Sequence, residues 1–462
     1  MRFRSLVVTL SAGLAACGGS SPPPAAPAPL RPAPAPAPPA PAAPIASDPE
    51  SIARDVVARL EAHDYKTVAA RFDDKMAAAL PPDKLEATWK QLATAVGAFD
   101  KIESAATKDD AGVHVVSLTA HFERARLVLL LSIDDRGKIA GFFIRPAEAP
   151  AVEWQPPAYA KLDAIVDNPV TIGTAPALPG TLTLPRGNGP FPAVVLVHGS
   201  GPNDADETVG GVKVFKDLAV GLASRGIAVL RYEKRTHASP AGVRTQKEEV
   251  DDAAHAAVAF LKTTSSIDHK RIVLLGHSQG GYLAPRIAKA DPAIRALVIF
   301  AGSTRPLEES IIAQLKYISS LAPDDEQVRT LVGEAEKFKQ TVQSPALKPD
   351  EPVALPTGGT ITGAYFLEVR GYHPEKIAAQ LAIPIAILQG ERDYQVTVAE
   401  DLAAWKAALG KRRSVSFFSY PDANHAFVAG TGKATPAEYT RPGHVEDKVI
   451  DDLAAWIGKL PK

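Results

Sequence analysis

The residues best suited to chemistry are a serine between glycines and, far downstream, an acid and a histidine. Ser278 stands in the pentapeptide Gly-His-Ser-Gln-Gly (276–280), between the apolar run 271–275 and a helix-like stretch over 282–290. A serine at a turn from strand to helix projects its hydroxyl above the sheet, and the flanking glycines let the backbone turn without a side-chain clash. By composition the pattern also arises by accident in roughly one chain in ten of this size, so it requires partners.

Two partners follow in order. Asp393 comes just after the apolar run 383–388, and His425 follows the strand-like run 415–420. A neutral serine hydroxyl is a poor nucleophile, so His425 would take the proton of Ser278 as the oxygen attacks a carbonyl. Asp393 would fix the tautomer of the imidazole and stabilise the imidazolium that forms.

Other residues compete for the last two roles. His444 is the main rival of His425, although its position at the start of the last amphipathic helix is typical of a cap or surface group. Asp393 is favoured because it lies just past a strand, where the active sites of parallel sheets gather. Its rivals are acids of the same region, Glu391, Asp401 and Asp422.

Ser, then Asp, then His is the chain order of the α/β-hydrolase triad. From about Leu178 to the C-terminus the chain resembles an α/β-hydrolase of the secreted bacterial esterase and dienelactone-hydrolase-like group. The resemblance rests on this order and on three further segments, 197–204 (Val-His-Gly-Ser-Gly-Pro-Asn-Asp), 215–219 and 226–232. It implies a mostly parallel sheet with a helical lid insertion.

In this fold two backbone N–H groups hold the oxyanion of the tetrahedral intermediate. One belongs to the residue after the nucleophile, which is Gln279, and the other to the loop after the third strand. Ser200 is the predicted donor of that loop, and Gly201 is the alternative. The same loop and the next strand end carry charges that either pair with one another or recognise a charged substrate: Asp204, Asp206, Glu207, Arg231, Glu233, Lys234 and Arg235.

The first residues read as an export signal. A basic start, Met1–Arg4, is followed by an apolar stretch too short to span a membrane and by the sequence Leu-Ala-Ala-Cys-Gly (14–18). This ending resembles a bacterial lipobox, in which Cys17 is acylated; an ordinary cleaved signal is the alternative. We therefore expect an exported lipoprotein of the bacterial envelope, periplasmic or at the cell surface, held to the membrane through Cys17.

Beyond the signal, composition divides the chain. Residues 18–47 are rich in proline and alanine, which predicts an extended tether or, as the alternative, a ligand for a proline-binding partner. Residues 48–147 show helical periodicity over 51–95 and then alternation with a hairpin turn at 134–137, which predicts a small α+β domain. That domain is similar to a domain of unknown function, with a cone-like fold of the nuclear-transport-factor-2 type, found upstream of such hydrolases. The predicted division is 1–17 signal, 18–47 tether, 48–147 small domain, 148–177 connecting segment and 178–462 hydrolase.

A long insertion interrupts the predicted sheet at about 303–375. Helices are expected over 307–320 and 325–341, and such insertions commonly form a lid that excludes water and selects the substrate. Tyr365, Phe366 and Tyr372 are candidates for the substrate-facing wall of this lid; packing within the lid is their alternative role.

The whole sequence favours one function over two others. With 462 residues and a net charge of −1, the chain offers no basic surface for nucleic acid, and it carries no phosphate-binding glycine loop and no metal-ligand spacing. We therefore predict a carboxylesterase acting on short or medium acyl esters, without metal or cofactor. A serine peptidase or amidase with the same triad and a non-catalytic envelope-binding lipoprotein are the alternatives.

Overall fold

The computed structural model describes residues 48–110, 113–147, 154–356 and 358–461. They divide into two compact units, with the boundary between Ala151 and Val152. The predicted signal, Cys17 and the tether 18–47 lie outside the described residues. Within the described part of the chain, no helix combines the length and the apolar character needed to cross a membrane.

The N-terminal unit is the predicted α+β domain. Four helices precede a four-stranded antiparallel sheet in the order β1-β2-β3-β4. Aspartates begin three of the helices, because the side chains of Asp48, Asp64 and Asp73 accept hydrogen bonds from free N–H groups of the first turn. The elements are α1 (Pro49–Glu61), α2 (Tyr65–Ala69), α3 (Asp74–Ala79), α4 (Pro82–Val96), β1 (Phe99–Asp110), β2 (Val113–Phe122), β3 (Ala125–Asp134) and β4 (Ile139–Pro146).

Two local predictions for this unit were wrong. The helical pattern predicted over 51–95 is broken at 70–73, because Phe72 forms a β-bridge with Ile139 and Asp73 starts a new helix. Strand β1 was missed, since its sequence Phe-Asp-Lys-Ile-Glu-Ser-Ala-Ala-Thr-Lys-Asp-Asp has few apolar residues and no sustained alternation. An edge strand pairs on one side only, so its sequence signal is weak.

The C-terminal unit is built on an eight-stranded sheet in the order β16-β15-β12-β11-β7-β10-β6-β5. The six strands from β16 to β10 are parallel neighbours, and β6 and β5 join them antiparallel. The predicted mostly parallel sheet is confirmed. The strands are β5 (Ile165–Ile172), β6 (Leu178–Pro185), β7 (Phe191–Val197), β10 (Ala228–Tyr232), β11 (Ile267–His277), β12 (Ala296–Phe300), β15 (Ile385–Gly390) and β16 (Val415–Tyr420).

The sheet is buried on both faces. In β7, Ala193, Val195 and Val197 belong to one hydrophobic cluster, whereas Val194 and Leu196 belong to another on the opposite face. Helices α7 (Asp252–Thr263), α8 (Gln279–Ala290) and α13 (Ala403–Leu409) contribute to the first cluster. Helices α5 (Val214–Ala223) and α14 (Asp447–Gly458) contribute to the second. Every central strand is therefore fixed from above and below, so the loops that leave it start from well-defined points.

Strand β5 lies in the segment 148–177, which the sequence suggested as a mere connection. It pairs with β6 over its whole length and buries Ile165 and Ile172. Pro169 in its middle weakens the strand signal in the sequence, but an edge strand tolerates proline because one side makes no ladder bonds. The sheet therefore begins before Leu178, the predicted boundary.

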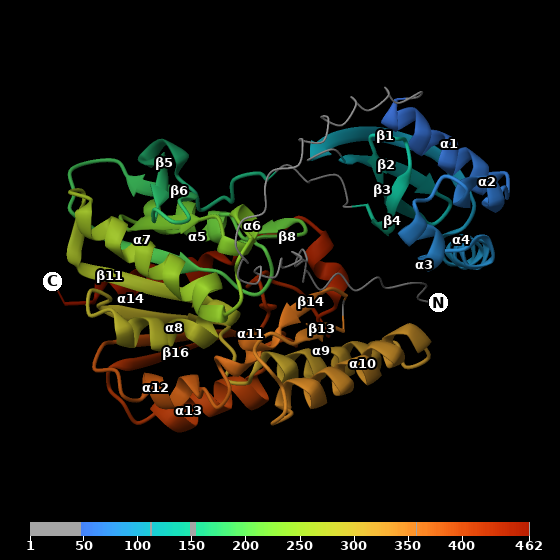
Figure 1. The fold of residues 1–462 in the computed structure, drawn as a ribbon. Helices are drawn as coiled ribbons and strands as arrows, with labels where there is room; N and C mark the ends of the chain where they lie inside the picture. The colour runs from blue at the N-terminus through green and yellow to red at the C-terminus, as the bar shows by residue number, and fades with distance from the viewer. Residues whose placement is uncertain (1–47, 111–112, 148–153, 357, 462) are drawn as a thin grey trace, which may run out of the picture. The chain divides into compact units, whose positions relative to one another are not determined.

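The insertion between β12 and β15 is helical, as expected. Helices α9 (Leu307–Leu321) and α10 (Glu326–Gln343) lie side by side (Figure 1), followed by the hairpin β13 (Pro352–Ala354) and β14 (Thr360–Thr362) and by α11 (Gly363–Leu367) and α12 (Pro374–Ala378). Its core includes Leu315, Phe338 and Phe366. The remaining elements are short: η1 (Leu162–Ala164), β8 (Thr208–Val209), β9 (Val212–Lys213), α6 (Arg235–Ala238), the π-helical turns η2 (Lys247–Asp251) and η3 (Val398–Leu402), and η4 (Pro436–Thr440).

Two phenylalanines of the N-terminal sheet provide a matched test of its core. Phe122 is 1% exposed and Phe143 is 66% exposed. We expect Phe122→Ala to lower the free energy of unfolding of this domain by about 3–5 kcal/mol, because it removes a buried ring and leaves a cavity. Phe143→Ala should change it by less than about 0.5 kcal/mol. Chemical denaturation followed by circular dichroism measures both, and equal effects would contradict the assigned core.

Candidate active site

Ser278 lies at a sharp turn between β11 and α8. Its backbone has φ 52° and ψ −112°, a conformation that a non-glycine residue rarely adopts. The strand before Ser278 is buried in the sheet, and α8 begins at the residue after it. The backbone N–H of Ser278 donates a hydrogen bond to Phe300 O at 3.0 Å. The turn therefore holds the serine at the carboxyl edge of the parallel strands, where ligands bind in such sheets.

The two glycines of the motif are required by close packing. A Cβ atom on Gly276 would lie 2.2 Å from Gly280 O, and one on Gly280 would lie 2.2 Å from Val197 O. No side chain fits at either position, because both neighbours are backbone atoms. The spacing that singled out Ser278 in the sequence thus has a steric cause.

Asp393 and His425 are brought together by adjacent strands. Asp393 follows β15 and His425 follows β16, and the imidazole donates from Nδ1 to Asp393 Oδ2 at 2.6 Å. The other carboxylate oxygen accepts the backbone N–H groups of Gln395 at 2.8 Å and Val396 at 3.0 Å. Asp393 is 4% exposed, so it is a preorganised carboxylate with its lone pairs satisfied.

His425 is also held close to the serine turn. The backbone carbonyl of His425 accepts a hydrogen bond from Nε2 of His277, the residue before Ser278, at 3.1 Å, and the two imidazole rings lie 4.9 Å apart. Residues separated by almost 150 positions are thus linked at one edge of the sheet. This arrangement leaves Nε2 of His425 as the ring nitrogen available for chemistry.

The competing residues have other partners. His444 faces Asp217 at 3.1 Å and stacks edge-on against Trp154, which ties the last helix to α5. Asp401 is buried against Arg305, and Glu391 accepts a hydrogen bond from Ser419. Among the acids weighed in the sequence, Asp393 is the one whose carboxylate meets His425.

The expected oxyanion donors lie on either side of the serine turn. Gln279 is the first residue of α8, whose N–H has no acceptor within the helix, and Ser200 follows β7 and Gly199. Among the residues that the structure describes, neither N–H donates to a protein acceptor. A Cβ placed on Gly199 would lie 3.1 Å from Cβ of Ser278, so the Gly199 loop packs directly against Ser278.

A buried ion pair supports the backbone beside Ser278. Glu207 accepts the N–H of Gly199 at 2.6 Å and pairs with Nδ1 of His277 at 2.8 Å. Burial alone would lower the pKa of the His277 imidazole, but the Glu207 carboxylate, the His425 carbonyl and the charge of Asp393 together raise it above its usual value. Burial would likewise raise the pKa of Glu207, and the charge of His277 instead keeps it below its usual value. Both nitrogens of His277 face oxygen acceptors, so the protonated ring satisfies both.

A second buried pair, Lys234 and Glu249, was missed as a site feature. Lys234 Nζ lies 2.9 Å from Glu249 Oε1 and donates to Gly199 O at 2.7 Å and to Gln279 Oε1 at 3.1 Å. The sequence placed Lys234 among the loop charges that either pair with one another or recognise a charged substrate, and it gave no sign of Glu249 as a partner. Lys234 lies just after β10 and Glu249 on η2, and no motif spacing joins the two.

The other charges of these loops also form ion pairs. Arg231 is buried against Asp206 at 3.0 Å and Asp167 at 3.2 Å, and Lys213 lies 3.0 Å from Asp206. The half-buried Glu233 and the exposed His237 pair as well. Mutual pairing therefore accounts for Arg231, Asp206 and Glu233, which were also considered for recognition of a charged substrate.

The three lid aromatics occupy different places. The Tyr365 hydroxyl accepts from Gln279 Nε2 at 2.7 Å and donates to Glu249 at 2.5 Å, which joins the lid to the residue after Ser278. Phe366 is 3% exposed and packs edge-on against Phe338 inside the lid. Tyr372 packs edge-on against Tyr282 of α8 and donates to its carbonyl at 3.1 Å.

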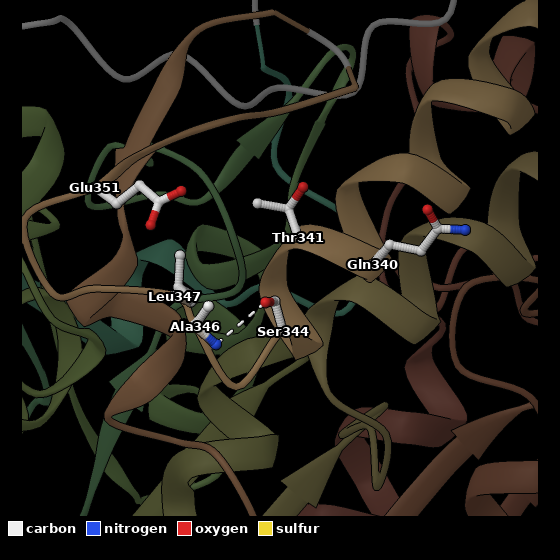
Figure 2. Close-up of a pocket in the computed structure, with 6 residues that line it drawn as sticks. All are labelled: Gln340, Thr341, Ser344, Ala346, Leu347 and Glu351. Carbon is white, nitrogen blue, oxygen red and sulfur yellow. Dashed lines mark hydrogen bonds between the residues drawn. The ribbon is translucent and has the colours of Figure 1, made fainter.

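A hollow of about 350 Å³ lies at the end of α10 (Figure 2) and contains none of the candidate catalytic residues. Its lining consists of Gln340, Thr341, Ser344, Ala346, Leu347 and Glu351. Within the described part of the chain, no group of three or more His, Cys, Asp or Glu side chains is arranged to hold a metal ion.

Comparison with known proteins agrees with this fold. The alpha/beta hydrolase family model matches residues 194–438, and a model described as a protein of unknown function, DUF3887, matches residues 53–142. The chain belongs to the alpha/beta hydrolase family. The predicted resemblance to an α/β-hydrolase with an upstream domain of unknown function is confirmed.

One relative matches nearly the whole chain. Esterase EstD of Thermotoga maritima is 36% identical over 409 residues, covering 87% of this chain and 94% of its own. Among solved structures, the chain is similar to Est1E from Butyrivibrio proteoclasticus, with 17% identity, a TM-score of 0.41 and coverage of 63% of this chain and 99% of its own. An esterase from Pyrococcus furiosus has 19% identity, a TM-score of 0.42 and coverage of 68% and 97%.

His198, at the start of the Gly199 loop, generates a pH prediction. It is buried between Phe215 and Tyr232, and burial lowers its pKa from 6.5 to about 4. Between pH 6.5 and pH 4 this histidine is protonated in the unfolded chain but neutral in the folded chain. The free energy of unfolding is therefore highest above pH 6.5 and decreases as the pH falls toward 4. The loss amounts to about 3 kcal/mol.

We therefore expect His198→Gln, which cannot titrate, to show a shallower fall in unfolding free energy between pH 6.5 and 4 than the wild type. His269→Gln, at an exposed histidine, is the control and should follow the wild-type slope. Urea titrations across this range measure the slopes. Parallel curves for wild type and His198→Gln would rule out a buried neutral imidazole.

Proposed function

We propose that this protein is a serine carboxylesterase that cleaves short or medium acyl esters through an acyl-enzyme. The observation that carries the proposal is the 2.6 Å hydrogen bond between His425 and Asp393, with His425 held by His277 beside the strained turn of Ser278. Membership of the alpha/beta hydrolase family and similarity to an esterase over 87% of the chain support it.

In the proposed reaction, Ser278 Oγ attacks the ester carbonyl while Nε2 of His425 takes its proton. Asp393 stabilises the imidazolium, and the N–H groups of Ser200 and Gln279 receive the charge of the tetrahedral oxygen. The imidazolium then protonates the departing alcohol. Water then attacks the acyl carbon while His425 takes its proton, and the imidazolium gives a proton to Ser278 Oγ as the bond to the acid breaks.

The lid is the proposed determinant of substrate range. Tyr365 has the strongest claim of the three aromatics, because its hydroxyl reaches the Gln279 side chain. Phe366 and Tyr372 would act behind it by fixing the lid's packing against Phe338 and Tyr282. Their proposed effect is on acyl selectivity, through the shape of the wall.

We expect Ser278→Ala to reduce kcat for p-nitrophenyl butyrate by at least about 10⁴-fold, because it removes the attacking oxygen. Labelling by a fluorophosphonate should disappear with it. Ser303→Ala changes a buried serine that follows the neighbouring strand β12 and is the matched control. It should keep both the turnover of p-nitrophenyl butyrate and the labelling by the fluorophosphonate. Full turnover by Ser278→Ala would refute the catalytic assignment.

Comparing the turnover of an ester with that of an amide tests whether the protein is an esterase or an amidase. An alcohol leaves readily, whereas an amine must be protonated as it departs, so the esterase proposal predicts faster turnover of p-nitrophenyl butyrate than of an aminoacyl p-nitroanilide. Faster turnover of the anilide would make the protein a peptidase or amidase with the same machinery.

We also propose that the enzyme is held to the bacterial envelope through a lipid on Cys17, on the basis of the lipobox-like sequence 14–18. Wild-type protein expressed in bacteria should fractionate with membranes, and mass spectrometry should find an acylated Cys17 at the mature N-terminus. Cys17→Ala should be released or retained with an uncleaved signal. An unmodified Cys17 on membrane-free wild-type protein would contradict this part of the proposal.

A further inference from the structure

We propose that Lys234 is a positioning residue for the oxyanion hole: it holds the Gly199–Ser200 peptide and Gln279 so that both N–H donors aim at the reacting oxygen. The inference rests on the proposed function, because it assumes that these two N–H groups receive the oxyanion. It assigns a role to a buried cation outside the Ser278, Asp393 and His425 triad.

Lys234 is fully engaged inside the protein. Its side chain is 2% exposed and that of its partner Glu249 is 3% exposed. The ammonium has three donors, and the three oxygens facing it belong to Glu249, to the Gly199 backbone and to the Gln279 side chain. Two of these three oxygens thus lie on the residues that flank the proposed oxyanion site.

Lys234 orients the N–H of Ser200 through the planar peptide group that joins Gly199 to Ser200. The carbonyl of Gly199 and the N–H of Ser200 belong to the same peptide and point in opposite directions, so fixing the carbonyl fixes the direction of the N–H. A hydrogen bond from a cation to the carbonyl also polarises the peptide and strengthens the N–H as a donor. Asn203 Nδ2 donates to the same oxygen at 3.0 Å, compared with 2.7 Å for Lys234.

Gly199 is held from its other side as well. Its own N–H donates to Glu207 at 2.6 Å, and Glu207 pairs with His277. The residue therefore lies between two buried charge pairs, one on its N–H and one on its carbonyl. Rotation of the Gly199–Ser200 peptide would break a charged hydrogen bond, so the donor direction is preset before substrate arrives.

The second donor is fixed through a side chain. Gln279 Oε1 accepts from Lys234 at 3.1 Å, and Gln279 Nε2 donates to Tyr365 at 2.7 Å. Tyr365 in turn donates to Glu249 at 2.5 Å, which closes a ring through four side chains. This ring holds the first residue of α8, whose backbone N–H is the proposed second donor.

Stability alone does not explain this pair. Removing a lysine and a glutamate from water costs roughly what their attraction returns, and apolar substitutes are often as stable. The contacts to Gly199 and Gln279 give the buried charge a use in orienting donors, where preorganisation is worth most.

The test compares Lys234→Met, and the double variant Lys234→Met/Glu249→Gln, with wild type on p-nitrophenyl butyrate. The double variant removes both charges, so no buried carboxylate is left unpaired if the single variant fails to fold. Arg412→Met is the matched control, because this half-buried cation also donates to two backbone carbonyls, those of Ala378 and Leu381. Arg412 precedes β16 and therefore lies at the amino ends of the parallel strands, away from Ser278 at their carboxyl ends.

A trifluoromethyl ketone with a butyl-sized chain serves as the probe of the oxyanion site. Ser278 Oγ bonds to its carbonyl carbon, the proton passes to His425, and the former carbonyl oxygen becomes an oxyanion. We expect Lys234→Met to lower kcat by about 10- to 100-fold, with KM within about twofold of wild type. Affinity for the ketone should fall by a similar factor, and Arg412→Met should change neither.

Three results would overturn the inference: kcat and ketone affinity near wild type in a folded variant, a fall in kcat without a fall in ketone affinity, or equal losses in Arg412→Met. The Ser278→Ala variant distinguishes failure of the proposed function from failure of the positioning role of Lys234. If that variant stays active, the proposed function itself fails; if it is inactive while the Lys234 variants are fully active, the positioning role alone fails.

Discussion

The site depends on the strained backbone of one residue. Ser278 holds φ 52° and ψ −112°, which costs roughly 1–3 kcal/mol and persists only where the surroundings enforce it. Here the enforcement comes from a buried parallel strand on one side, a helix on the other, and glycines at 276 and 280 whose missing Cβ atoms would overlap backbone. The sheet supplies the same edge to Asp393 and His425, so one constraint collects residues from three distant stretches.

Around this turn the protein uses buried charge to fix backbone direction. Glu207 and His277 hold one side of Gly199, and Lys234 and Glu249 hold the other. The first pair includes His277, the residue before Ser278, and Lys234 of the second pair donates to Gln279, the residue after it. Catalysis by preorganised dipoles requires donors that do not reorient during the reaction, and charged hydrogen bonds inside a dry interior are suited to that requirement.

Much of the fold and part of the site could be predicted from the sequence. The order of Ser278, Asp393 and His425 and the apolar runs before them depend on local patterns, and the structure brings His425 and Asp393 together. Strands β1 and β5 were missed, because a polar edge and an internal Pro169 weaken the signal where only one side of a strand is paired. The ring of Lys234, Glu249, Gln279 and Tyr365 could not be predicted from the sequence, since its members come from a loop and three helical elements that meet only in three dimensions.

The most direct measurement is a crystal structure of the enzyme after reaction with a butyl-sized fluorophosphonate. We predict phosphorus bonded to Ser278 Oγ, its free oxygen within hydrogen-bond distance of the N–H groups of Ser200 and Gln279, and Nε2 of His425 beside the serine oxygen. An adduct on another residue, or a free oxygen turned away from both N–H groups, would contradict it.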